Sequence, residues 1–395
     1  MRLTNKIITA SKLLKNKEFY YLIKLLIQNP SNQIHNNLYY INLSINWLLK
    51  ANIICDGNGF SKLFSLRDGW FGPYAETTGY IIPTLYSATE FTNYKKNEIY
   101  YTIQKSADWL LSVQYNNGAF GDSVSFKPKV YKTTQEQVFD TGQAIFGLIS
   151  SYEKIGKNIY LDSAVKAGNW LLKVQDESGS WTKFVYNNIP HTYYSRVAFA
   201  LCKLWEVTGV EQFKQSALKN VEWVIKNQKE NGAFLNCSFL PDNKPVLHVI
   251  AYTIEGLWKS GLILKEELIK QYAIKSASIL KEIQKRDKIL FSHYNLDWEP
   301  VDSSRCLTGL AQMAEIWLSM YDTTGDEEMF DAAVVALNYL KQKIITNKNY
   351  SNLHGGLLGS FPWWGKYFPW AIPNWGNKFF IDALLLEEKL NRHFH

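Results

Sequence analysis

The sequence predicts an all-α domain in which six inner helices alternate with six outer helices around a closed ring. The first observation behind this prediction is a segment, usually running from Trp to Gln, that recurs at intervals of 53 to 62 residues. The second is a nearly all-apolar helical pattern between successive copies. Repeats of this kind bury their apolar faces against their neighbours, so the whole array is predicted to form one domain. The copies begin at Trp47, Trp109, Trp170, Trp223, Ile279 and Tyr339.

The two kinds of segment differ in which side is polar. The repeated segments carry Lys and Glu on one side, which predicts outer helices that face water. In the second copy, Trp109, Leu110 and Val113 share one helix face, and residues 116–118 (Asn-Asn-Gly) form a stop signal. The intervening segments are apolar nearly all round, which predicts buried inner helices. They begin near Glu76, Gly142, Arg196, Ile250, Arg305 and Lys378.

The links between the predicted helices are unequal in length. Links from an inner to an outer helix are short, whereas links from an outer to an inner helix run to roughly 20 to 35 residues. All six long links must emerge at the end of the ring where the inner helices begin. Functional residues are therefore expected at that end, because loops of this length usually carry function.

Composition and charge exclude several classes of protein. A net charge of +7 is mild for 395 residues and no basic run is present, so no nucleic-acid partner is predicted. The four cysteines stand singly, without Cys-x-x-Cys spacing, which argues against structural zinc and fits a reducing compartment. No two histidines lie four residues apart on a predicted helix. Neither a metal nor another cofactor is predicted.

Residues 1–37 are predicted to form a separate basic amphipathic helix, and residues 38–395 the single ring domain. In residues 1–27, five lysines accompany apolar residues at helical spacing. Such a helix either packs on the outside of the domain, which is the simpler interpretation, or lies on an anionic membrane surface. Signal-peptide features and an apolar run of about 20 residues are not found in the sequence. The predicted location is cytoplasmic, with peripheral contact to the inner membrane as the alternative.

The segments 109–118 and 170–179, each running from Trp through Gln to Gly, resemble the Gln-Trp-type repeats of terpenoid cyclases. The alternation over residues 38–394 resembles the six-hairpin (α/α)6 toroid superfamily. Its members include glycoside hydrolases, polysaccharide lyases, uronyl C5-epimerases, terpenoid cyclases and prenyltransferase β-subunits. Residues 76–83 and the last long link, 352–375, are similar to those of uncharacterised toroid proteins encoded with bacterial surface-polysaccharide machinery. The resemblance implies a fold and a setting, but the reaction must be argued from the site.

Two carboxylates are the first candidates for acid and base chemistry. Glu76 lies among aromatic residues, including Trp70 and Tyr74, which are expected to desolvate it and raise its pKa. The alternative is a first-turn Glu favoured by the helix dipole. Asp140 is the second carboxylate, and a pair across a cleft suits glycoside hydrolysis. Tyr194 and His248 are the candidates to remove a proton in a lyase or epimerase reaction.

Candidate substrate-binding residues gather before each inner helix and in the last long link. Because they occupy equivalent places in their repeats, they are expected to converge on one axial cleft. Arg196 and Lys378 oppose the dipole of a helix start, so capping does not explain them. The glycines and tryptophans of residues 352–375 suit a sugar ring, or else form an aromatic plug that closes the ring. The candidates are Trp70, Tyr74, His191, Arg196, Tyr252, Arg305, His354, Trp364, Tyr367, Trp375 and Lys378.

The cations among these candidates predict an anionic substrate. The leading hypothesis is an enzyme of bacterial surface-polysaccharide metabolism that acts on an acidic oligo- or polysaccharide, free or lipid-linked. Lyase or uronyl C5-epimerase chemistry is placed ahead of hydrolysis by paired carboxylates. A non-catalytic glycan-binding protein is the second hypothesis. Isoprenoid chemistry is the third, although the Asp-x-Asp-Asp motif of class II terpenoid cyclases and the Asp-x-Cys motif of prenyltransferases are both absent.

Overall fold

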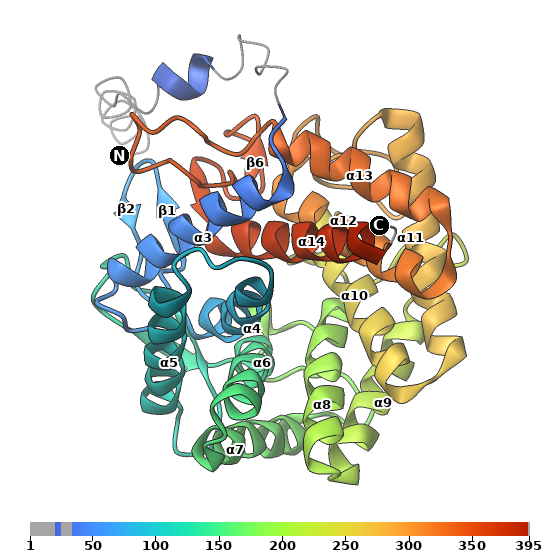
Figure 1. The fold of residues 1–395 in the computed structure, drawn as a ribbon. Coiled ribbons are helices and arrows are strands. Elements are labelled where there is room, and N and C mark those ends of the chain that lie inside the picture. Colours follow the sequence, from blue (N-terminus) through green and yellow to red (C-terminus); the bar gives the residue numbers. More distant parts are fainter. Residues whose placement is uncertain (1–19, 25–33, 394–395) are drawn as a thin grey trace, which may run out of the picture.

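The computed structural model describes residues 20–24 and 34–393, and these form a closed ring of helices around a central axis (Figure 1). Each inner helix packs against the next, and α14 packs against both α12 and α4, which closes the ring. The inner helices are α4 (Ala75–Phe91), α6 (Val138–Ile155), α8 (Ser195–Thr208), α10 (Leu247–Leu264), α12 (Leu307–Thr324) and α14 (Asn374–His393). The outer helices are α3 (Asn37–Ile53), α5 (Lys96–Val113), α7 (Asn158–Val174), α9 (Glu211–Lys226), α11 (Glu267–Asp287) and α13 (Glu327–Lys341). The predicted alternation is confirmed.

The outer helices are held in sequence by the repeated glutamines. Gln175 follows α7, and its Nε2 donates at 3.0 Å to the carbonyl oxygens of Gly179, in the next turn, and Ser216, in α9. Ser216 Oγ in turn donates to Gln175 Oε1 at 2.7 Å. Gln114 makes the same contacts one repeat earlier, with Gly118 and Ser163, at 2.7 to 2.9 Å. The Trp-to-Gln repeat is therefore explained by packing between neighbouring hairpins.

The inner helices approach one another closely, above all α4 and α6. Gly79 of α4 lies against the backbone of α6, where a Cβ would come within 2.3 Å of the carbonyl oxygen of Gln143. Only a residue without a side chain fits there. This contact brings the first turns of α4 and α6 together, and with them Glu76 and Asp140.

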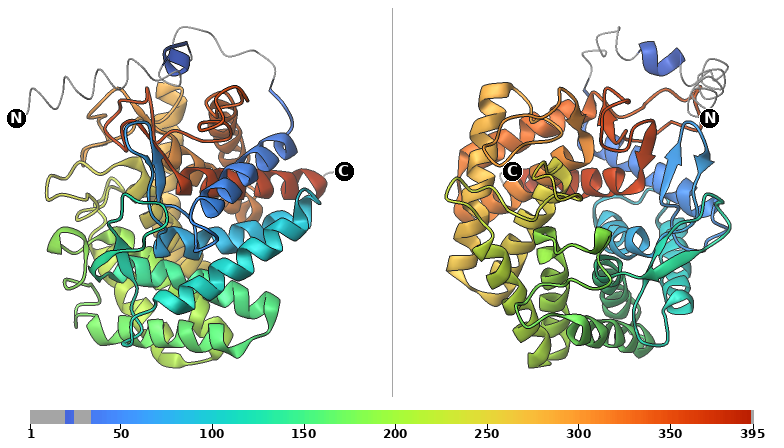
Figure 2. Two further views of the ribbon diagram at one scale, coloured as in Figure 1. Left: turned by 90° about the vertical axis from the view of Figure 1, so that its left-hand side faces the viewer. Right: turned by 180° about the vertical axis from the view of Figure 1, so that it is seen from behind.

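The long links all lie at one end of the ring, as predicted, and carry the short strands (Figure 2). β1 (Leu63–Ser65) pairs antiparallel with β2 (Gly69–Trp70) and with β7 (Ala371–Pro373), so the first and last long links share a sheet. The other two sheets are two-stranded antiparallel pairs at the same end. They join β3 (Gly121–Ser123) to β4 (Thr133–Glu136) and β5 (Arg305–Cys306) to β6 (Ser360–Phe361).

The predicted N-terminal helix falls mostly outside the described residues. Residues 20–24 are helical, and the Tyr21 ring stacks on Tyr350 in the last long link at 4.4 Å between centroids. In the part of the chain that the structure describes, no helix combines the length and the apolar character needed to cross a bilayer.

Candidate functional site

A cavity of about 660 Å³ opens at the long-link end of the ring. We call it the axial cavity. Its walls come from the long links and from the first turns of α4, α6 and α10. Three carboxylates, several tyrosines and other aromatic side chains line it.

Glu76 and Asp140 are the two carboxylates in the first turns of α4 and α6. Burial is the largest cause that raises the pKa of each above its ordinary value. For Asp140 the nearby charge of Glu76 is the second cause, and its pKa is raised well above the usual range. Asp140 Oδ1 is buried and has no hydrogen-bond partner among the described residues. Asp140 is therefore the member of the pair that holds a proton.

The surroundings of Glu76 favour its ionised form more than those of Asp140 do. The Tyr80 hydroxyl donates to Glu76 Oε1 at 3.2 Å. A hydrogen bond from Tyr74 and the charge of Lys62 lower the pKa of both carboxyl groups, and the charge of Arg196 further lowers that of Glu76, against the larger effect of burial. The pair thus has one carboxyl group suited to donate a proton and one suited to act as a carboxylate.

The tyrosines and the histidine beside this pair are poorly suited to remove protons. Burial raises the pKa of Tyr194 and Tyr252 well above that of a free phenol. Burial lowers the pKa of His248 to about 3, although a hydrogen bond to Gln312 opposes the shift. The His248 Nδ1 lies 2.6 Å from Gln312 Oε1, which fixes a neutral ring with its proton on Nδ1. These groups can bind a substrate while remaining uncharged.

A histidine–aspartate pair lies at the wall of the cavity. His293 lines it, and its Nδ1 lies 2.7 Å from Asp302 Oδ2. Ser304 donates from its backbone N–H and its hydroxyl to Asp302 Oδ1 at 2.8 and 2.6 Å. Burial opposes the ionisation of Asp302, but these hydrogen bonds outweigh it and keep the pKa of Asp302 below its ordinary value. The aspartate therefore fixes the orientation of the His293 ring.

Eight of the residues predicted from the sequence line the axial cavity. The other seven lie elsewhere, so the expectation that all of them converge on one cleft is wrong. The lining residues are Tyr74, Glu76, Asp140, Tyr194, His248, Tyr252, Tyr367 and Trp375. The last long link contributes to the wall through Tyr367 and Trp375, whose Nε1 donates to the Tyr367 hydroxyl at 2.7 Å. It also helps to close the ring through β7.

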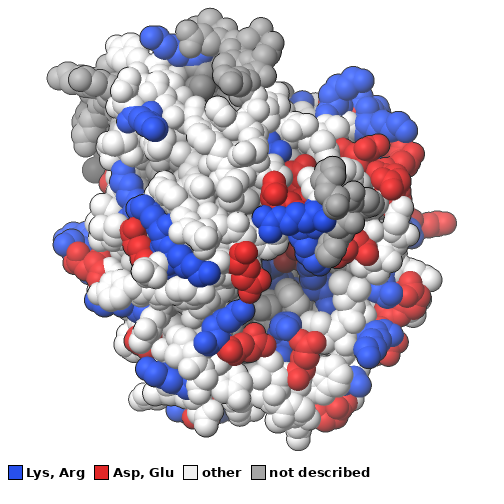
Figure 3. All heavy atoms as spheres, viewed as in Figure 1, with Lys and Arg blue, Asp and Glu red and all other residues white. Residues whose placement is uncertain are grey.

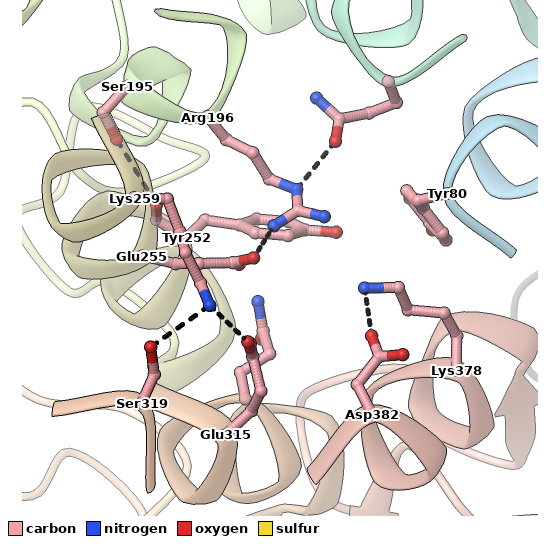
Figure 4. Close-up of polar contacts among 12 residues, drawn as sticks. Tyr80, Ser195, Arg196, Tyr252, Glu255, Lys259, Glu315, Ser319, Lys378 and Asp382 are labelled. Atoms are coloured by element: carbon pink, nitrogen blue, oxygen red, sulfur yellow. Dashed lines mark hydrogen bonds and ion pairs between the residues drawn. The ribbon is translucent and has the colours of Figure 1, made fainter. Parts of the chain in front are cut away.

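Arg196 and Lys378 point away from the axial cavity, below its floor (Figure 4). Arg196 forms an ion pair with Glu255, and its Nε donates to Gln143 Oε1 at 2.7 Å. Lys378 lies one turn inside α14 and pairs with Asp382 at 2.5 Å. Both side chains extend toward the far end of the ring.

The other five residues outside the axial cavity are held in other packing contacts. Trp70 packs on Trp47, with ring centroids 4.8 Å apart, and His191 is buried behind the wall, with Nε2 2.8 Å from the carbonyl oxygen of Tyr186. The guanidinium of Arg305 lies 3.6 Å from the centre of the Phe291 ring. Partial burial and the charges of nearby lysines lower the pKa of His354. The Trp364 side chain is 52% exposed at the surface.

This placement changes the charge balance at the cavity. Among the described lining residues, the lysines are Lys62 and Lys366 and the carboxylates are Glu76, Asp122 and Asp140. The cation excess expected from the sequence is therefore not found there. That excess was the reason for placing lyase or epimerase chemistry ahead of hydrolysis.

Several polar residues at the cavity were missed as site candidates, among them Lys62, Asp122, His293 and Lys366. Lys62 Nζ lies 4.3 Å from the centre of the Tyr74 ring and donates to the Ser123 carbonyl oxygen at 3.3 Å. Nothing in its sequence neighbourhood distinguishes it. The turn-forming Asn295-Leu-Asp297 could have indicated the hairpin that brings His293 close to Asp302.

Within the described ranges, 20–24 and 34–393, no three His, Cys, Asp or Glu side chains are grouped so that they could hold a metal ion.

The chain is similar in sequence to part of the squalene–hopene cyclases. The squalene–hopene cyclase C-terminal domain family matches residues 60–197. A squalene–hopene cyclase of Zymomonas mobilis is 27% identical over 136 residues, which are 33% of this chain and 20% of that enzyme. The match to that relative thus spans one fifth of its length. The family match, over residues 60–197, includes two of the Trp-to-Gln repeats.

Solved structures match nearly the whole chain. An unsaturated glucuronyl hydrolase specific for heparin has a TM-score of 0.70 at 14% identity, over 90% of this chain and 98% of that one. A cellobiose 2-epimerase from Bacillus thermoamylovorans has a TM-score of 0.66 at 14% identity, over 88% and 98%. This chain has the (α/α)6 toroid fold. An α-amylase from Clostridium perfringens is also similar, with a TM-score of 0.64 at 14% identity, over 89% and 98%. The toroid and the likeness to cyclase repeats were both predicted and are confirmed.

Proposed function

We propose that this toroid is a carbohydrate-active enzyme that hydrolyses a glycosidic bond in the axial cavity. The observation that carries the proposal is the pair Glu76 and Asp140, whose surroundings favour different protonation states. In glycoside hydrolysis one carboxyl group protonates the leaving oxygen and the other acts as a carboxylate at the sugar carbon. We assign the first role to Asp140 and the second to Glu76. The fold neighbours, which include hydrolases and epimerases of sugars, are consistent with this class of substrate.

The rest of the cavity suits a sugar ring. Phe139, Tyr193 and Trp375 offer flat apolar faces, and the neutral His248 offers a hydrogen-bonding nitrogen. Lys62 and Lys366 are the groups that would contact a carboxylate, if the glycan is acidic. We propose an oligosaccharide of a bacterial surface polysaccharide as the substrate, free or lipid-linked. That setting rests on the resemblance of residues 76–83 and 352–375, and the catalytic unit is residues 38–395.

The experiment is a panel of neutral and uronate-containing oligosaccharides incubated with the full chain in D2O. New reducing ends are followed together with proton NMR. Hydrolysis gives reducing ends without deuterium at C5 and without an unsaturated product. Glu76→Gln and Asp140→Asn should each reduce the rate by about 10²- to 10⁴-fold, the usual contribution of a general acid or base. A matched control is Glu90→Gln, which removes a surface carboxylate paired with Lys154.

Other outcomes would overturn the assignment. Deuterium at C5 without cleavage indicates an epimerase, and absorbance near 232 nm indicates a lyase. If glycans bind but none turns over, the protein is a glycan-binding toroid. Full activity in both carboxylate variants would remove Glu76 and Asp140 from the mechanism.

A further inference from the structure

A second cavity, of about 340 Å³, lies at the opposite end of the ring. We call it the short-link cavity, because the short connections between inner and outer helices surround that end. All six inner helices contribute to its lining. Figure 3 shows the corresponding face of the molecule, where Lys and Arg side chains are visible inside a central hollow. The proposed reaction makes no use of this cavity.

Eight acidic or basic side chains line the short-link cavity, and six of them form three ion pairs with one another (Figure 4). Arg196 pairs with Glu255, Lys259 with Glu315 at 2.9 Å, and Lys378 with Asp382 at 2.5 Å. Such pairs give little net stability compared with apolar packing of the same volume. Stability alone is therefore a weak reason to keep six charged groups around an open cavity.

The pairing leaves hydrogen-bonding capacity unused. Glu255 is 3% exposed, and among the described residues its Oε2 has no hydrogen-bond partner. Among the described residues, the Lys378 ammonium group pairs with Asp382 and lies 3.8 Å from the centre of the Phe379 ring, and with three N–H donors it can still donate to a ligand. A ligand that both donates and accepts hydrogen bonds would satisfy these groups.

The lining has four basic side chains (Arg196, Lys203, Lys259 and Lys378) and four acidic ones (Glu153, Glu255, Glu315 and Asp382), so an acid would be bound by individual cations rather than by a net positive charge. Burial raises the pKa of Glu255, which weakens its negative charge. Arg196 is held between aromatic rings, 5.0 Å from the centre of Tyr252 and 5.3 Å from that of Phe146, and it keeps its positive charge. Phe146 and Phe199, with ring centroids 4.8 Å apart, add a flat apolar wall.

We propose that the short-link cavity is a second binding site, for a small hydroxylated acid of the size of one uronic acid. The hydroxyl groups would donate to Glu255 Oε2 and the carboxylate would accept from Lys378. A volume of about 340 Å³ lies at the lower end of the range for ligand pockets, which suits a single ring.

The two cavities share a floor that is one layer of side chains thick. The Tyr80 side chain lines the short-link cavity, while its hydroxyl donates at 3.2 Å to Glu76 in the axial cavity. Arg196, on the short-link side, packs against Tyr252, which lines the axial cavity. An anion bound next to Arg196 would weaken the field that favours the ionised form of Glu76. Binding of an anion in the short-link cavity should therefore raise the pKa of Glu76 in the axial cavity.

The test measures binding of D-glucuronate and D-glucose to the full chain by titration calorimetry. Because the readout is binding, its outcome does not depend on whether the axial cavity hydrolyses glycosides. We expect D-glucuronate to bind at least about tenfold more tightly than D-glucose, as a charge-assisted hydrogen bond would give. The double variant Lys378→Met with Asp382→Leu removes an ion pair together, so no buried charge is left alone, and it should weaken D-glucuronate binding about tenfold or more.

Two further variants keep the test decisive. Ser87→Trp places a bulky side chain at the exposed mouth of the short-link cavity and should also abolish binding if the double variant does not fold. Lys281→Met with Glu328→Leu removes a surface ion pair of 2.5 Å between α11 and α13 and should leave binding unchanged. Equal affinity for D-glucuronate in the wild type and in the Ser87→Trp variant would overturn the proposal, as would the absence of any D-glucuronate binding.

Discussion

After burial, the charge of Glu76 is the largest influence that raises the pKa of Asp140, one inner helix away. The two residues occupy the first turns of α4 and α6, and Gly79 lets these helices pack closely enough for their carboxyl groups to interact. This relationship makes Asp140 a proton donor, and it also makes the fold sensitive to pH.

Replacing Asp140 with Asn should stabilise the fold while it removes activity. The pKa of Asp140 is raised well above its ordinary value of 3.8. In the wild type its contribution to stability is therefore fully present below that pH and is lost as the pH rises through the folded pKa. Asn stays neutral, so the advantage of the variant should be near zero at low pH. It should then grow by up to about 1.4 kcal/mol for each pH unit across this window. Urea unfolding of the variant and the wild type, at several pH values between acidic and neutral, measures this difference in stability.

The exposed Asp331 on α13 provides the control for this experiment. Asp331→Asn should show no comparable gain at any pH. A wild type that is more stable than Asp140→Asn at neutral pH would mean that Asp140 is ionised and favourably paired.

Replacing Tyr80 with Phe should shift the pH dependence of catalysis. The Tyr80 hydroxyl donates to Glu76 Oε1 at 3.2 Å and so favours the ionised carboxylate. A hydrogen bond to a charged group contributes about 1.5 kcal/mol or more, which corresponds to about one pH unit. The acidic limb of the kcat/KM profile should therefore move upward by about one unit. The exposed Tyr101→Phe serves as the comparison, and an unmoved limb in Tyr80→Phe would separate Tyr80 from Glu76.

The His293–Asp302 pair should act in substrate binding. His293 is oriented by a contact of 2.7 Å with Asp302 and lines the axial cavity. His293→Gln and Asp302→Asn should each raise KM about tenfold and leave kcat nearly unchanged, as expected when one hydrogen bond worth ~1.4 kcal/mol is lost. Steady-state kinetics on the best substrate of the panel decide this. A large fall in kcat for His293→Gln would place the residue in the chemical step instead.

Replacing Gln175 with Leu should reduce stability and spare activity. The side chain makes three hydrogen bonds between the end of α7, the following turn and α9. With about 1 kcal/mol for each, the loss should be about 2 to 3 kcal/mol in the free energy of unfolding. Gln215→Leu is a matched change on the exposed side of α9, where Gln215 contacts Glu211, and it should cost much less. If Gln175→Leu lost activity at full stability, the repeat would have a role beyond packing.

The repeat predicts the architecture because the same contact is built many times. Each Gln at the end of an outer helix must meet the next outer helix, so its spacing records the size of one hairpin. The predicted first residues of the inner helices are less accurate than the predicted architecture. α6 begins at Val138, four residues before the predicted Gly142, because the apolar pattern does not mark where the long link ends.

The site was harder to predict than the fold, because position along the chain does not fix the direction of a side chain. Arg196 and Lys378 stand near the starts of inner helices, as expected, but their long side chains extend down the axis. Arg196 pairs with Glu255 on the neighbouring helix α10, and Lys378 pairs with Asp382 one turn further along α14. Arg305 precedes its helix in β5 and lies over Phe291. Lys62 and His293 reach the cavity only through the tertiary arrangement of their links, which no local pattern in the sequence reveals.

The sixth helical hairpin has no covalent link, since it is formed by the last helix, α14, packed on the first helix of the ring, α3. Glu387 of α14 receives hydrogen bonds from Asn37 at 2.7 Å and Lys341 at 3.3 Å, and Trp47 Nε1 donates to Asn374 at 2.7 Å. The ring of helices is thus closed by packing between α14 and α3, where no peptide connects them. A peptide joining the two ends, with new termini opened in the short link after Gly209, should yield a circular permutant with the same axial cavity. Deleting α14 would instead open the circle and expose the apolar faces of α4 and α12 together.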